Sequence, residues 1–280
     1  MTTPCLVIDL DKIEHNTRTI VELCKSNGIE VTGVTKVTCG HPQVAKAMLR
    51  GGVTALADSR LENIQRLINA GIDTKLMLLR LPALSSADEV VESVAVSLNS
   101  ELAVLEALST AAQQRGKVHE VILSVDLGDL CEGIWPDDLL PFAREAARLP
   151  GIHIKGLGTN LACFAGVVPD EDNMKRLVEL AAEVERLTQD VHRDEVLRAG
   201  KRATLEQLAE KALEEYGLTV ENLVAEYGPE QAVPVADGEK IARAAPVASD
   251  ATCSTTGTAS PPYSSDDGSK GRAISVDSRR

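Results

Sequence analysis

Residues 31–42 read VTGVTKVTCGHP, an apolar strand-like run that stops at a glycine and a proline. Because strand side chains alternate between faces, Thr32, Val34 and Lys36 share one face. A lysine at the C-terminal end of an inward strand face must be solvated, paired with an anion or converted into a neutral form. A Schiff base with an aldehyde cofactor is one neutral form. The alternative interpretation is a lysine that ends the strand and reaches back to water.

Apolar strand-like runs alternate with amphipathic helical runs through the first 190 or so residues. A run as apolar as residues 76–79 is typical of a parallel strand whose two faces are both covered. Repeated βα units of this length predict a TIM-like barrel or a doubly wound sheet. Besides the strand that carries Lys36, the predicted strands are residues 5–10, 53–57, 75–81, 95–98, 120–126 and 152–157. The predicted helices are residues 12–25, 42–50, 61–70, 87–92, 101–115, 136–148 and 171–187.

Polar and small residues gather where the predicted strands end. The clusters are residues 38–41, 57–60, 80–82, 97–100, 126–129 and 158–164. In a barrel, the chemistry lies at this C-terminal end of the strands. A single cluster is explained by helix capping, for which Asp58, Ser59 and Ser100 are suitable residues. Six successive clusters around one rim favour a binding site.

Seven segments, in order along the chain, carry a resemblance to a known family. They are residues 3–10, 33–36, 57–63, 77–82, 98–102, 125–130 and 154–163. Together they resemble the alanine racemase N-terminal domain family, and within it the ornithine-racemase-like branch. The fold of that family is a barrel that binds pyridoxal 5'-phosphate (PLP). The resemblance therefore implies a TIM-like PLP-binding (β/α) barrel in this chain.

The resemblance also implies a set of site residues. Lys36 would carry PLP, and Cys163 is a candidate for the acid/base on the opposite face of the cofactor. The other candidates are His41, Asp58, Ser59, Arg80 and Asn160 for the cofactor, and Asp126 and Asp129 for the substrate. Each has a structural alternative, because a buried cysteine is usually inert and the polar residues are also good loop or helix caps.

The chain departs from the family pattern in two places. Cys131 stands where related racemases carry arginine. A thiol cannot replace the planar, positively charged guanidinium group of arginine. After His192, the expected phosphate-binding loop and the last barrel strand have no counterpart. We therefore expect an incomplete barrel, with the last two strands missing, over residues 1–192.

The rest of the chain is expected to be an extension of a different character. Residues 193–228 read as a polar helical segment, in which Thr204 opens a helix that ends at Tyr216 and residues 221–227 form another. Residues 229–280 are rich in Ser, Thr, Gly, Pro and Asp, which predicts a disordered low-complexity tail.

Charge and composition limit the partners. A formal net charge of −13 argues against nucleic acid and anionic membranes. No apolar run approaches the roughly 20 residues of a membrane helix, and we expect no signal peptide. The six cysteines show no metal-ligand spacing and no disulfide framework, which favours a reducing cytoplasm and no bound metal.

The function that the resemblance implies is a PLP-dependent amino-acid racemase, acting on ornithine, another basic amino acid or alanine. Racemisation needs an acid or base on each face of the substrate, so Lys36 alone is insufficient. The partner is then a small-molecule amino acid, and a homodimer is left open. Two alternatives also stay open: a non-catalytic PLP-binding protein and an inactive truncated fragment. We expect poor turnover from this chain.

Overall fold

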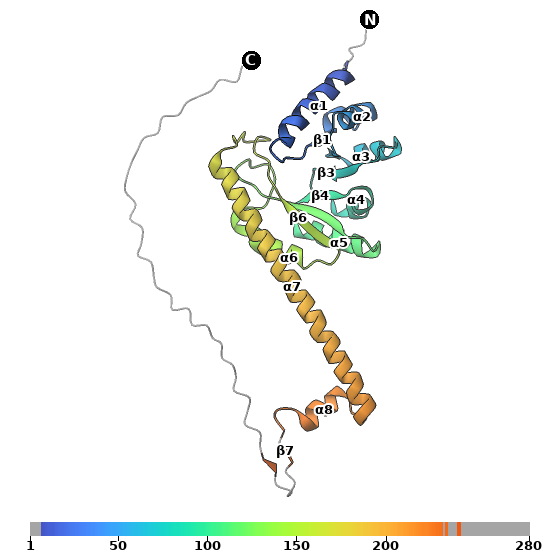
Figure 1. The fold of residues 1–280 in the computed structure, drawn as a ribbon, viewed down its shortest axis with the longest axis vertical. Helices are drawn as coiled ribbons and strands as arrows, with labels where there is room; N and C mark the ends of the chain where they lie inside the picture. The colour runs from blue at the N-terminus through green and yellow to red at the C-terminus, as the bar shows by residue number, and fades with distance from the viewer. Residues whose placement is uncertain (1–6, 232, 235–239, 242–280) are drawn as a thin grey trace, which may run out of the picture. The chain divides into compact units, whose positions relative to one another are not determined.

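The sheet in this computed structural model, which describes residues 7–231, 233–234 and 240–241, is parallel and has six strands (Figure 1). Each strand pairs with the one that precedes it in the chain. The strands are β1 (Thr32–Val34), β2 (Ala55–Asp58), β3 (Lys75–Leu78), β4 (Val96–Asn99), β5 (His119–Ser124) and β6 (Ile152–Gly158). This order is that of a barrel wall, because a doubly wound sheet reverses its strand order at a switch point. The predicted TIM-like architecture is therefore confirmed.

One helical segment separates each pair of strands, and α2 to α5 lie along one side of the sheet (Figure 1). The helices are α2 (Pro42–Arg50), α3 (Leu61–Asn69), α4 (Ala87–Ser93), α5 (Leu102–Gln114) and α6 (Leu139–Ala147). Short 3-10 turns lie at η1 (Lys36–Thr38), η2 (Leu84–Ser86) and η3 (Pro136–Asp138). Aliphatic side chains form the core between sheet and helices, among them Leu56, Leu123, Ile64, Leu105 and Leu108, all at 0 % exposure.

The two faces of β1 differ in exposure as the alternation predicts. Gly33 and Thr35 are buried, whereas Thr32, Val34 and Lys36 are exposed. In β2, the partners of Gly33 and Val34 are Leu56 and Ala57, and both of these are buried. The exposed face is therefore a local feature of β1, on the side from which Lys36 follows.

The predicted strand at residues 5–10 is wrong for the part that can be checked. Residues 7–9 have no regular structure, and residues 5 and 6 lie outside the described residues. Helix α1 (Leu10–Lys25) begins there instead, because the Asp9 carboxylate accepts the backbone N–H groups of Asp11 and Lys12 at 3.1 Å. This is an N-cap, and it ends the extended run two residues before the predicted helix start.

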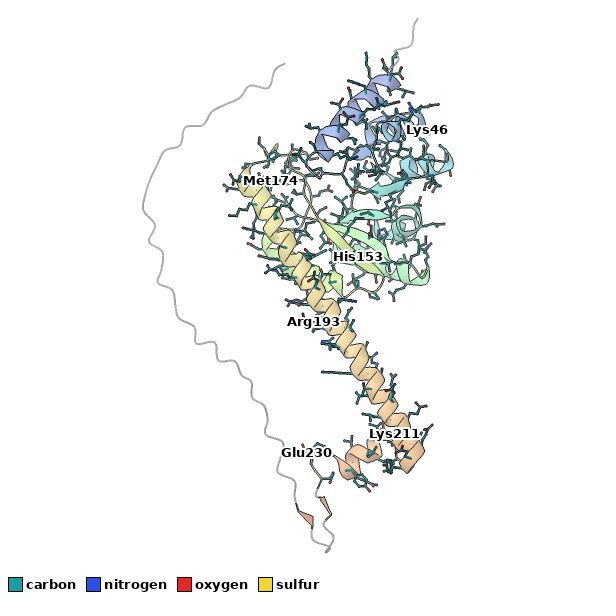
Figure 2. All side chains as sticks on the ribbon, in the orientation of Figure 1. Lys46, His153, Met174, Arg193, Lys211 and Glu230 are labelled. Atoms are coloured by element: carbon teal, nitrogen blue, oxygen red, sulfur yellow. The ribbon has the colours of Figure 1, made fainter. Side chains whose placement is uncertain are left out.

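A 46-residue helix, α7 (Glu171–Tyr216), replaces the two shorter helices that the sequence predicts. The Thr204 hydroxyl donates to the Gly200 carbonyl at 3.0 Å within the helix, so it does not cap a new one. Leu180 and Val184 are buried in the core of the sheet region. Figure 2 shows the side chains along this helix, with Met174 near its start and Arg193 further along.

The chain divides into two compact units, Met1–Leu205 and Glu206–Arg280. The division between these two units falls inside α7. The second unit includes α8 (Val220–Tyr227), close to the predicted helix, and a short antiparallel pair, β7 (Val233–Pro234) with β8 (Lys240–Ile241). Most of the tail predicted to be disordered lies outside the described residues. None of the helices in the described part of the chain is both long and apolar enough to cross a membrane.

Candidate functional site

Lys36 lies directly after β1 and opens the η1 turn. Its side chain is exposed, and it makes no hydrogen bond or ion pair with another described residue. The preceding residue, Thr35, is fully buried and fixed to β2. Its backbone N–H donates to the Ala57 carbonyl at 2.9 Å, and its hydroxyl donates to Asp58 Oδ2 at 2.7 Å. The lysine therefore projects from an anchored backbone with an amine that is free to react.

Asp58 is the anchor on the β2 side, with 0 % exposure. Its Oδ1 accepts the side-chain amide of Asn63 at 2.9 Å and the backbone N–H of Arg60 at 3.1 Å. Together with the Thr35 hydroxyl, these donors occupy both carboxylate oxygens. Asp58 thus joins the Lys36 turn to the start of α3, which makes it a positioning residue in this structure.

The turn after Lys36 is packed against α3. Gly40 has φ +65°, and a Cβ there would lie 2.7 Å from the Asn63 carbonyl oxygen, so this position requires glycine. The Arg66 guanidinium donates to the Cys39 carbonyl. His41 caps α2, because its Nδ1 accepts the Gln43 backbone N–H at 3.3 Å. The predicted cofactor residue His41 therefore lies at a helix N-terminus with one ring nitrogen already engaged.

Ser59 and Arg80 follow β2 and β3 on the same rim. Ser59 is half-buried and Arg80 is exposed. Adjacent strands lie about 4.8 Å apart, so β1 and β3 place the Lys36 and Arg80 backbones roughly 10 Å from each other. The rim thus carries two exposed basic side chains, Lys36 and Arg80, after β1 and β3.

Asp126 and Asp129 lie in the loop between β5 and η3, and both are buried. Asp126 Oδ1 accepts the backbone N–H groups of Gly128 at 2.8 Å and Leu130 at 3.2 Å, so it closes its own loop. A substrate group that binds Asp126 would therefore compete with these two backbone N–H groups for its carboxylate.

Asp129 reaches across to the loop after β6. It accepts the backbone N–H groups of Cys163 at 3.2 Å, Phe164 at 2.9 Å and Ala165 at 3.0 Å. Burial raises the pKa of the Asp129 carboxyl, but these hydrogen bonds outweigh that effect, and the pKa lies below its usual value. Asp129 is therefore an ionised carboxylate that holds two rim loops together.

Two further contacts join the same loops. The Asn160 side-chain amide donates to Glu132 Oε1 at 3.1 Å. Cys131 Sγ donates to Cys163 Sγ at 3.6 Å, and both cysteines are exposed. This hydrogen bond raises the pKa of the Cys131 thiol, and desolvation and nearby negative charge add to the effect. The candidate acid/base Cys163 is thus paired with the residue that departs from the family pattern.

A buried polar group on β4 and β5 escaped the sequence reasoning. Ser97 Oγ lies 2.8 Å from His119 Nε2, and the Asn99 amide donates to Ser97 Oγ at 3.0 Å. Burial lowers the pKa of His119 to about 4, so the imidazole is neutral. Thr35 and Asn63 lie in segments that carry the resemblance, but they were missed as well, because their residue types alone do not distinguish them from core or cap residues.

The chain matches the family model "Alanine racemase, N-terminal domain" over residues 8–215. It is 40 % identical over 182 residues to the ornithine racemase of Acetoanaerobium sticklandii, a match that covers 65 % of this chain and 51 % of that protein. It is 34 % identical over 186 residues to the lysine racemase of Thermotoga maritima, which covers 66 % of this chain and 52 % of that protein. The chain therefore spans about half the length of these curated relatives.

Solved structures share the fold at lower identity. The alanine racemase of Streptomyces coelicolor aligns with a TM-score of 0.56 and 22 % identity, over 64 % of this chain and 50 % of that one. The alanine racemase of a D-cycloserine-producing Streptomyces lavendulae gives 0.56 and 20 %, over 68 % and 51 %. These likenesses support the barrel architecture alone.

Proposed function

Since the chain belongs to the alanine racemase N-terminal domain family, we propose that it functions as a PLP-dependent amino-acid racemase with a basic amino acid as substrate. One observation carries the proposal: the Lys36 amine is exposed just after β1, no other described residue pairs with it, and Thr35 and Asp58 anchor its backbone. The ornithine and lysine racemases among the relatives favour a basic substrate.

The donor set of the rim fits PLP. Lys36 would hold its aldehyde end, because a free primary amine adds to a carbonyl carbon. Arg80 and the α2 N-terminus at His41 are the candidates for its phosphate, which favours cations and helix N-termini. When bound, PLP withdraws electrons from the Cα of an amino acid and so makes the Cα proton acidic.

Side chains of the protein would carry out the proton transfers on the two faces of the substrate Cα. Lys36 Nζ would serve one face, as the base that takes the Cα proton in one direction of the reaction and as the acid that returns a proton in the other direction. Cys163 Sγ is the proposed group for the other face, because it lies on the rim loop that follows β6, which Asp129 holds in place. An acid/base on each side is what inversion of a stereocentre requires.

A basic side chain on the substrate needs an acidic partner with an available oxygen. Asp129 is unsuitable because its oxygens accept three backbone N–H groups. Glu132 is half-buried on the same loop and accepts one hydrogen bond, from Asn160. We therefore assign recognition of the substrate ammonium to Glu132, with Asn160 orienting its carboxylate.

A second function, non-catalytic binding of PLP, is favoured by the state of the two proposed catalytic groups. Lys36 is free in the described structure, whereas the Cys163 thiol is hydrogen-bonded to Cys131. A protein with one effective acid/base would bind the cofactor without racemising an amino acid.

The test has two steps on the purified full chain. PLP is added, the protein is reduced with borohydride, and tryptic peptides are mapped by mass spectrometry. The cofactor mass is expected on Lys36 and absent from Lys46, an exposed lysine on α2 that serves as the internal control (Figure 2). A Lys36→Ala variant should lose the label.

Exchange between L- and D-ornithine, lysine and alanine is then followed by chiral chromatography. Label on Lys36 with exchange supports the racemase. Label without exchange supports the non-catalytic protein. Equal labelling of Lys36 and Lys46, or no label at all, would contradict both functions.

A further inference from the structure

The pair of thiols at the rim is the feature that the racemase proposal does not use in full. Cys131 lies in the loop that follows β5, and Cys163 in the loop that follows β6, 32 residues apart in sequence. Their sulfur atoms are nevertheless 3.6 Å apart, and both side chains are exposed to solvent. A disulfide bond is about 2.05 Å long, so its formation requires the two sulfur atoms to approach by about 1.5 Å.

The surrounding hydrogen bonds fix the two loops together on both sides of this pair. Asp129, two residues before Cys131, accepts the backbone N–H of Cys163 itself at 3.2 Å. Glu132, the next residue after Cys131, accepts the side-chain amide of Asn160 at 3.1 Å. The thiols are therefore held at a high effective concentration before any bond forms.

We propose that Cys131 and Cys163 form a reversible disulfide when the protein meets a low-molecular-weight disulfide such as oxidised glutathione. One cysteine thiolate attacks the oxidant, forms a mixed disulfide and releases one glutathione thiolate. The second cysteine then attacks the protein sulfur of that mixed disulfide and displaces the second glutathione. The two thiols are oxidised to one disulfide, and one oxidised glutathione is reduced to two thiols.

A metal site is the competing interpretation of the same atoms. The ligand atoms of Asp129, Cys131 and Cys163 all lie within 4.8 Å of one another. However, the oxygens of Asp129 already accept the N–H groups of residues 163–165. A metal ion would therefore compete with these hydrogen bonds for the Asp129 carboxylate, whereas a disulfide leaves them intact.

The disulfide would act on the rim by removing the Cys163 thiol and fixing the two loops covalently. Its formation does not depend on the racemase function, but its effect on turnover rests on that proposed function. The bond and the activity are therefore measured separately.

The bond is tested by peptide mapping of the full chain after incubation in glutathione redox buffers and quenching by acid. Trypsin places Cys131 in residues 118–144 and Cys163 in residues 156–175, each as the sole cysteine of its peptide. We expect these two peptides to appear linked, in protein that remains monomeric on a non-reducing gel. Cys39, an exposed cysteine on another part of the rim, is the control. Its reaction with oxidised glutathione should end at the mixed disulfide.

The linked fraction should exceed the mixed-disulfide fraction at Cys39 by at least about tenfold in the same buffer, because closure is intramolecular. In Cys131→Ser, Cys163 should carry glutathione as Cys39 does. Equal glutathione on Cys163 in both proteins, or linkage only within dimers, would overturn the proposal. So would tight retention of added zinc that blocks oxidation in the wild type and is lost in Cys131→Ser.

Activity gives an independent readout. If the linked peptide forms and racemisation falls until dithiothreitol restores it, the bond regulates the proposed site. If the linked peptide forms in a protein that never racemises, the disulfide stands and the proposed function fails.

Discussion

The buried imidazole of His119 predicts a loss of stability in mild acid. Burial lowers the pKa of His119 to about 4 from an ordinary value of 6.5. The side chain is 2 % exposed, and its Nε2 is 2.8 Å from Ser97 Oγ. Below pH 6.5 the unfolded chain takes up a proton that the folded chain does not. Acid therefore favours unfolding until the pH falls to the folded value near 4.

The size of the effect follows from the two pKa values. Stability changes by about 1.36 kcal/mol per pH unit where only the unfolded state is protonated. Between pH 7 and pH 5, His119 should therefore cost the fold about 2 kcal/mol. The carboxyl groups with lowered pKa values, Glu120 and Asp129 among them, titrate below this window and contribute little.

Urea unfolding of the full chain, followed by far-ultraviolet circular dichroism at half-unit pH steps, measures this loss. His119→Gln removes the titrating group and keeps an amide for Ser97. Between pH 7 and pH 5, the free energy of unfolding of this variant should therefore fall by about 2 kcal/mol less than that of the wild type. His15→Gln, at an exposed position on α1, should follow the wild type. Parallel pH profiles for wild type and His119→Gln would refute the reasoning, whatever their absolute stabilities.

Three further outcomes are expected. Leu105→Ala in the core should lower the free energy of unfolding by about 2–5 kcal/mol. Leu205→Ala, at a side chain that is 66 % exposed, should change it by less than about 0.5 kcal/mol. If urea denaturation shows the larger loss for Leu205→Ala, the assigned core is wrong. Thr35→Val leaves the buried Asp58 carboxylate without one donor and should cost roughly 1.5–3 kcal/mol in the same assay, while Thr35→Ser should recover most of it. Racemisation of ornithine at saturating PLP should stay slower than about 1 per second, because the Cys163 thiol is engaged by Cys131, and a faster rate by chiral chromatography would contradict this.

The strand and helix order was predictable because it depends on local patterns. Apolar runs such as residues 76–79 need cover on both faces, and this requirement alone indicates parallel strands under helices. The errors arose where a single capping contact decides the outcome. Asp9 starts α1 inside an apparently extended run, and Thr204 bonds within α7 although its sequence resembles a cap.

The sequence predicts which residues lie after the ends of the strands, but not the individual contacts that these residues make. Lys36 follows from alternation along one strand, which is a local property. Asp58 is occupied by Thr35 and Asn63, and these partners become visible only when β1, β2 and α3 are assembled. The Cys131–Cys163 pair depends on how Asp129 holds a loop more than 30 residues away, which no spacing in the sequence encodes.

The Thr35–Asp58–Asn63 network lies on the helix side of the sheet, behind the lysine that it supports. The groups proposed to recognise a substrate, Glu132 and Asn160, belong to loops of other strands. Mutations in those loops leave the support of Lys36 untouched. If the proposed roles hold, substrate preference can diverge during evolution while the lysine keeps its place, because the two sets of residues lie on separate parts of the barrel.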